Sequence, residues 1–149
     1  MCIFCVRGES SWCDFRIEVM KHLSPRQSWD LLQATSDAIL IDIRMEVESL
    51  YVGRPPRAIN IPWYEFPDFE ADGAAFVLAV SREVTRKEQI VVLICRSGSR
   101  TLDAGEALVR AGFTNVVNVV NGFEGDLDAD DHRSTVNGWR FEGLPWEQM

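Results

Sequence analysis

A chain of 149 residues with 46% hydrophobic and 26% charged residues has the size and composition of a single globular domain. Its formal net charge of −8 argues against a nucleic-acid-binding protein, which would need a basic face. No apolar run approaches the roughly 18 residues that cross a bilayer, and the first twenty residues lack the apolar core of a secretory signal, so we expect a cytoplasmic protein that binds neither nucleic acid nor membrane.

The amino-terminal segment differs from the rest of the chain in its cysteines. It shows no clear periodicity and holds three of the four cysteines, namely Cys2, Cys5 and Cys13. We interpret residues 1–18 as a loosely ordered extension and residues 19–149 as the folded domain. Together with His22, these cysteines could form a metal site or a thiol relay, but zinc sites usually have two tight ligand pairs and this set has one. Incidental cysteines are favoured, and we expect no metal.

Patterns typical of strands and helices alternate along the rest of the chain. The first helix is expected to begin at Ser24, which can form a capping box with Gln27 and precedes Pro25 at the first helical position. The next elements, in chain order, are a buried strand over 38–43, a short helix over 46–51, a loop over 53–57, a strand over 58–61, a helix over 69–84 with a weak start around Gly73, a strand over 89–94, a helix over 101–111 that Gly112 ends, and a strand over 115–120. Such alternation predicts an α/β fold, with an open parallel sheet and helices on both of its faces.

The strand over 89–94 leads directly into a polar loop that begins with Cys95. Ligands of open α/β sheets bind beyond the carboxyl ends of the strands, and here a helix begins where the loop ends. The loop amides and the helix N-terminus supply partial positive charge, which favours a thiolate and binds anions. We therefore predict that Cys95 is a nucleophile and that its loop binds an anionic substrate through Arg96, Ser97, Gly98, Ser99 and Arg100. The alternative, a buried structural thiol, does not explain two arginines, a glycine and two serines in the next five positions.

The same loop resembles a known active site. Its sequence, Cys95-Arg96-Ser97-Gly98-Ser99-Arg100, is similar to the active-site loop of the rhodanese family of single-domain sulfurtransferases. The match runs from about Val19 to Trp146, and its other similar stretches are Asp42-Ile43-Arg44, the run from Gly53 to Pro62, Gly122-Phe123, Trp139 and Gly143-Leu144-Pro145. The resemblance implies a rhodanese-like fold.

The resemblance also implies covalent catalysis in two steps. Cys95 would attack the outer sulfur of a small anionic donor such as thiosulfate. The resulting persulfide would then pass its sulfur to cyanide, a low-molecular-weight thiol or a small sulfur-carrier protein. Thiosulfate, polysulfide, glutathione persulfide and mercaptopyruvate all stay open as donors, and no metal or organic cofactor is implied.

Two other functions stay open. One is a catalytically quiet module that only binds partners, against which the intact Cys95 and the two loop arginines argue. The other is a phosphatase or arsenate reductase of the same fold. Relatives of that kind have five residues between cysteine and arginine, whereas four separate Cys95 from Arg100. The smaller loop suits a sulfur atom better than a tetrahedral phosphate.

Charged residues that precede the loop in sequence complete the expected site. We expect Asp42 and Arg44 to support it by tying the end of their strand to a neighbouring loop through a carboxylate–guanidinium contact. Arg54 and Arg57 depart from the family pattern. They either add positive charge at the mouth of the pocket or are simply solvated.

The segment 124–138 is longer than the corresponding segment of the family. It leaves the carboxyl end of the last strand, so His132 or Arg133 could contact a substrate or partner there, although a surface loop is the favoured interpretation. Its acidic part, residues 124–131, could recognise a basic carrier protein.

Overall fold

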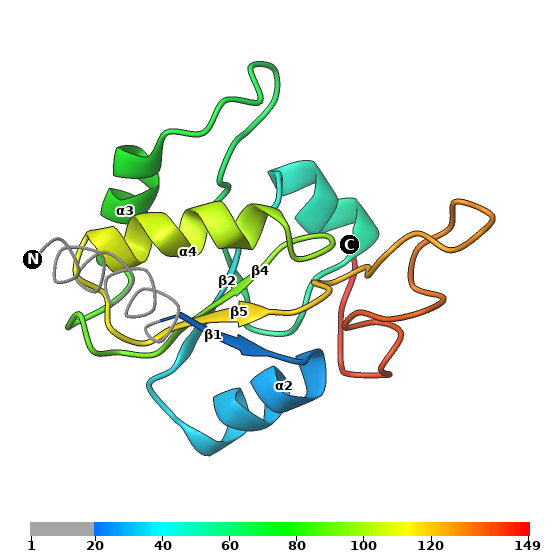
Figure 1. Cartoon of the computed structure of the whole chain (residues 1–149), viewed down its shortest axis with the longest axis horizontal. Coiled ribbons are helices and arrows are strands. Elements are labelled where there is room, and N and C mark those ends of the chain that lie inside the picture. Colours follow the sequence, from blue (N-terminus) through cyan, green and yellow to red (C-terminus); the bar gives the residue numbers. More distant parts are fainter. Residues whose placement is uncertain (1–19) are drawn as a thin grey trace, which may run out of the picture.

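The computed structural model describes residues 20–149, which form a sheet with helices on both faces (Figure 1). The predicted extension, residues 1–18, and its three cysteines lie outside the described residues. Within residues 20–149 the strands are β1 (Met20–Leu23), β2 (Ile39–Asp42), β3 (Ile59–Asn60), β4 (Val91–Ile94) and β5 (Val116–Val119). All their pairings are parallel, in the order β1-β5-β4-β2-β3. The predicted α/β fold class is therefore confirmed.

The helices divide between the two faces of the sheet. Helix α2 (Pro25–Ala34) covers one face, and α3 (Gly73–Ser81) and α4 (Arg100–Arg110) cover the other, as Figure 1 shows. A five-residue π-helix, η1 (Glu48–Val52), follows β2. Because successive side chains of a strand point to opposite faces, neighbours such as Val92 and Leu93 enter different cores. Two apolar cores thus hold the sheet from both sides, which explains why its central strands are almost wholly hydrophobic.

The start of α2 confirms the predicted capping box. The amide of Gln27 donates to Ser24 Oγ at 3.1 Å, and the amide of Ser24 donates to Gln27 Oε1 at 3.0 Å. The helix predicted over 69–84 is shorter than expected. It begins at Gly73, because the carboxylate of Asp72 accepts the amide of Ala75 at 3.0 Å and so caps the helix there.

Strand β1 was not predicted as a strand. It has four residues and pairs with β5, and within residues 20–149 it is the edge strand of the sheet. Among residues 20–149, no helix combines the length and the apolar composition that crossing a bilayer requires.

Candidate active site

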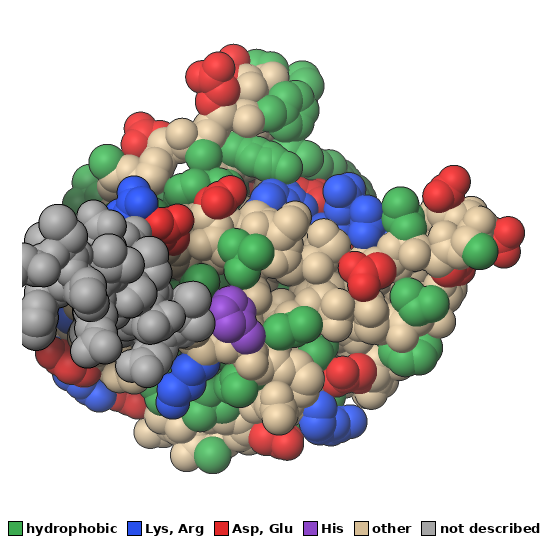
Figure 2. All heavy atoms as spheres, viewed as in Figure 1, with side chains coloured by type: hydrophobic (Ala, Val, Ile, Leu, Met, Phe, Trp, Pro, Cys, Tyr) green, Lys and Arg blue, Asp and Glu red, His purple; other side chains and the backbone are tan. Residues whose placement is uncertain are grey.

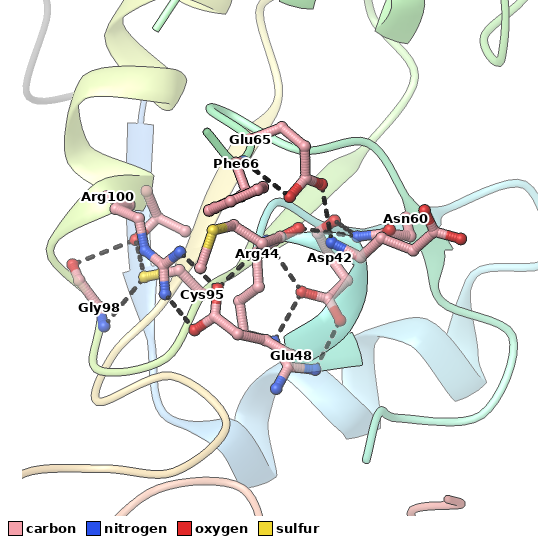
Figure 3. A network of polar contacts seen from close by, with 12 residues as sticks. Asp42, Arg44, Glu48, Asn60, Glu65, Phe66, Cys95, Gly98 and Arg100 are labelled. Carbon is pink, nitrogen blue, oxygen red and sulfur yellow. Dashed lines mark hydrogen bonds and ion pairs between the residues drawn. The ribbon is translucent and has the colours of Figure 1, made fainter. Parts of the chain in front are cut away.

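Cys95 is the first residue after β4, at the carboxyl end of a strand buried on both faces. Its side chain is fully buried on the face covered by α3 and α4. The amide of Gly98 donates to Cys95 Sγ at 3.1 Å (Figure 3), and Thr101 Oγ1 lies 3.6 Å from the same sulfur. Gly98 has φ +95°, a conformation that residues with a side chain rarely adopt and that turns the chain back toward the sulfur. The loop therefore closes around the thiol and directs a backbone N–H at it.

A turn at Gly122 packs against the backbone of the cysteine loop. The amide of Phe123 donates to the carbonyl of Cys95 at 2.8 Å, and the amide of Glu124 donates to the carbonyl of Arg96 at 2.9 Å. A Cβ atom at Gly122 would lie 2.5 Å from the carbonyl oxygen of Cys95, which no real side chain tolerates. Only glycine fits here, so this turn and the cysteine loop are held against each other.

Arg100, the first residue of α4, is engaged by a carboxylate. Its Nη1 and Nη2 donate to Glu48 of η1 at 2.8 and 2.9 Å, a two-pronged pair that Figure 3 shows beside Cys95. Burial raises the pKa of Glu48, but the hydrogen bonds and charge of Arg100 outweigh it and hold that pKa below its usual range. For Arg100, burial lowers the pKa, and the hydrogen bond and charge of Glu48 outweigh it and raise the pKa. The guanidinium also lies 5.3 Å from the ring centre of Tyr64.

Asp42 and Arg44 form a second pair, inside the protein. Arg44 Nε and Nη2 donate to the two carboxylate oxygens of Asp42 at 2.8 and 2.6 Å, and neither side chain is exposed. Arg44 Nη2 also donates to the carbonyl of Gly53 at 2.6 Å, while its guanidinium lies 4.5 Å from the ring centre of Phe123. The pair thus joins the end of β2 to the loop after η1 and to the turn under Cys95.

The remaining predicted site residues are less enclosed. Arg96 and Ser99 are exposed, and Ser97 is half-buried. Figure 2 shows Lys and Arg side chains gathered in a hollow between two protruding segments of the chain, in a surface that elsewhere mixes charges of both signs. Of the two arginines that depart from the family pattern, Arg54 pairs with Glu147 at 3.3 Å, and Arg57 lines a separate cavity beside α2.

The segment 124–138 starts at the cysteine loop and then folds upon itself. Its neck is closed by two hydrogen bonds, from the amide of Asp126 to Asn137 Oδ1 at 2.8 Å and from Asn137 Nδ2 to Asp126 Oδ2 at 2.9 Å. Arg133 donates to the carbonyl of Gly125 at 2.7 Å, inside the same segment. Beyond the neck the segment is an exposed loop, as the favoured interpretation had it.

Four residues of the site region escaped the sequence-based prediction: Glu48, Thr101, Asn118 and His22, the last considered only as a metal ligand. Asn118 carried a usable signal, because a single amide inside an apolar strand needs a hydrogen-bonding partner. Glu48 carried none, because its partner Arg100 lies 52 residues away. In the described part of the chain, His, Cys, Asp and Glu side chains nowhere gather in threes as a metal ion would require.

Known proteins resemble the chain over most of its length. The family model of the rhodanese-like domain matches residues 24–129. The crystal structure of Rv0390 from M. tuberculosis is 36% identical with a TM-score of 0.75, and the match covers 87% of this chain and 98% of that one. The thiosulfate sulfurtransferase GlpE of Haemophilus influenzae is 27% identical over 105 residues, which are 70% of this chain and 86% of that protein. The solution structure of a polysulfide-sulfur transferase homodimer from Wolinella succinogenes is 24% identical with a TM-score of 0.61, covering 99% of this chain and 91% of that one, and shares the fold.

Proposed function

The chain belongs to the rhodanese-like domain family, and on that premise we propose that it is a sulfurtransferase in which Cys95 carries sulfur as a persulfide. The observation that carries the proposal is the contact of 3.1 Å between the amide of Gly98 and the buried sulfur of Cys95. A backbone N–H held at that distance favours negative charge on the sulfur, both in the attacking thiolate and in the persulfide. The similarity to a thiosulfate sulfurtransferase supports the same reaction.

The reaction runs in two displacements at sulfur. The thiolate of Cys95 attacks the outer sulfur of thiosulfate, a new S–S bond forms, and sulfite leaves with the electron pair of the bond that breaks. A nucleophilic acceptor then attacks the outer sulfur of the persulfide, and the thiolate of Cys95 leaves. The acceptor is cyanide in an assay, and a low-molecular-weight thiol or a carrier protein in a cell. Cys95 is a thiolate before the first step and again after the second, so the cycle needs no oxidant or reductant.

The charges of the loop fit a small anionic donor. Arg96 is exposed at the loop, where it is free to meet a dianion such as thiosulfate. Arg100 lies deeper and meets the same anion only in competition with Glu48. A reaction that depends on a free thiol suits the reducing cytoplasm, which is where we place the protein.

Mass spectrometry of the intact protein tests the proposal. After incubation with thiosulfate, the protein should gain one sulfur atom, about 32 Da, and Cys95→Ser should not. A matched control replaces Cys2, Cys5 and Cys13 by serine and should still gain the sulfur. The same adduct in Cys95→Ser would move the chemistry to the amino-terminal cysteines. No adduct with thiosulfate, polysulfide or mercaptopyruvate would favour a module that only binds partners.

A further inference from the structure

A line of four polar side chains connects Cys95 with the edge of the sheet. Thr101 Oγ1 lies 3.6 Å from Cys95 Sγ and 2.6 Å from Asn118 Oδ1, and Asn118 Nδ2 lies 3.1 Å from Nδ1 of His22. The four residues come from the loop after β4, from α4, from β5 and from β1, and Figure 1 shows β5 and β1 side by side. Cys95, Thr101 and Asn118 are buried, whereas His22 is exposed. The line therefore runs from the nucleophile to the surface.

Asn118 is the least expected member of this line. It stands in the middle of β5, whose other three residues are buried valines, and only 3% of it is exposed. A buried amide destabilises the fold unless both of its polar ends are hydrogen-bonded. Both ends are used here, one by Thr101 and the other by His22. Filling space in the core would not require an asparagine, so its role lies in these hydrogen bonds.

The hydroxyl of Thr101 has one hydrogen and three polar neighbours. Two of them, the carbonyl of Gly98 at 3.1 Å and Oδ1 of Asn118 at 2.6 Å, can only accept. In this arrangement the hydrogen points away from Cys95, and the sulfur must be the donor in its contact with Thr101. The observed pattern therefore suits a thiol. A thiolate needs the hydroxyl hydrogen for itself.

The geometry points to Asn118 as a positioning residue that acts on Cys95 through Thr101. With its oxygen toward Thr101, Asn118 draws the hydroxyl hydrogen from the sulfur and favours the thiol. With the amide turned over, its NH₂ donates to Thr101, and the hydroxyl hydrogen is free to stabilise a thiolate. His22 then carries a hydrogen on Nδ1 and donates to Asn118 Oδ1. No proton passes along the line: the thiol proton leaves to water, the hydroxyl rotates, and the amide turns. His22, which is exposed, exchanges its ring hydrogen from Nε2 to Nδ1 with water.

The charged groups beside Cys95 are the same in both arrangements. They are Arg96 in its own loop and two pairs that Figure 3 shows, Arg100 with Glu48 and Arg44 with Asp42 at the end of β2. A substitution at Asn118 leaves all of them in place. The inference rests on the proposed function only in taking Cys95 as the nucleophile.

The pH dependence of Cys95 alkylation tests the inference. Iodoacetamide reacts with the thiolate, and mass spectrometry of the Cys95 peptide follows the rate in the full-length protein. Asn118→Leu removes the closer of the two acceptors that compete for the hydroxyl hydrogen and leaves the weaker contact with the Gly98 carbonyl. The midpoint of the rate profile should therefore fall, giving about twofold to tenfold more thiolate at a fixed pH below it. Thr101→Val should raise the midpoint by a similar factor, and Thr101→Ser should restore it.

The two substitutions are then combined to separate this role from packing. In the Thr101→Val background, Asn118→Leu should have no further effect, because the hydroxyl through which Asn118 acts is gone. An equal shift in both backgrounds would overturn the inference. If Asn118→Leu does not fold, His22→Leu replaces it in the test. His22→Leu removes the partner of Asn118 Nδ2, so the amide can turn more easily and the midpoint of the rate profile should fall. An unchanged midpoint would contradict the proposed role of Asn118. Alkylation needs no sulfur donor, so these outcomes stand apart from the persulfide experiment.

Discussion

Two carboxylate–arginine pairs lie beside the cysteine loop and differ in burial. Asp42 and Arg44 are wholly buried, whereas Glu48 and Arg100 keep 13% and 14% of their side chains exposed. The buried pair joins β2 to Gly53 and lies against Phe123, so it holds parts of the fold together. The other pair joins η1 to the first residue of α4 beside Cys95, where the proposed function has an anionic donor compete for the arginine. The same kind of pair is thus enclosed in the scaffold in one place and lies next to the candidate nucleophile in the other.

The largest effect is expected from breaking the buried pair. Arg44→Leu leaves the carboxylate of Asp42 buried without its partner, which should cost about 3–5 kcal/mol of unfolding free energy. Denaturant unfolding monitored by tryptophan fluorescence would measure it. Replacing both Asp42 and Arg44 by leucine removes both charges and should recover much of the loss. A single variant as stable as the parent would show that the pair does not hold the scaffold.

Substitutions in the Glu48–Arg100 pair should change substrate binding, in opposite directions. Arg100→Ala removes the proposed charged contact with the donor, worth about 1.5–3 kcal/mol, and should raise KM for thiosulfate at least about tenfold. Glu48→Gln removes the competing charge and should lower KM about threefold or more by the same reasoning. Steady-state kinetics with cyanide as acceptor measures both. If KM rose in both variants, Glu48 would be supporting Arg100 rather than competing with the donor.

The smallest effect expected is on the pH dependence of stability. The pKa of Glu48 is lower in the folded protein than in the unfolded chain, so its contribution is present above the unfolded value of about 4.3 and is lost as the pH falls through the folded value. From about pH 5 downward, the parent should therefore lose more stability than Glu48→Gln. Thermal unfolding at several pH values would show it. Asp37→Asn is the matched control, because Asp37 and Arg86 are half exposed and such pairs contribute little.

Local sequence was enough to predict what depends on neighbours in the chain. The capping box of Ser24, the buried strand before Cys95 and the glycine in its loop are all short-range patterns, and the fold class follows from their alternation. The partner of Arg100 lies 52 residues away, and the two partners of Asn118 lie 17 and 96 residues away, so no local pattern reveals them. Strand β1 was missed for a related reason: four residues at an edge carry too short a pattern, and their pairing with β5 decides their conformation.

The hydrogen-bonded neck of the segment 124–138 separates the cysteine loop from a stretch of chain whose length can vary. Because Asp126 and Asn137 bind each other, the chain enters and leaves this loop at one place, whatever lies between. Doubling the length of a flexible loop costs only about 0.6 kcal/mol in closure entropy. Insertions and deletions between these two residues can therefore accumulate without disturbing the cysteine loop.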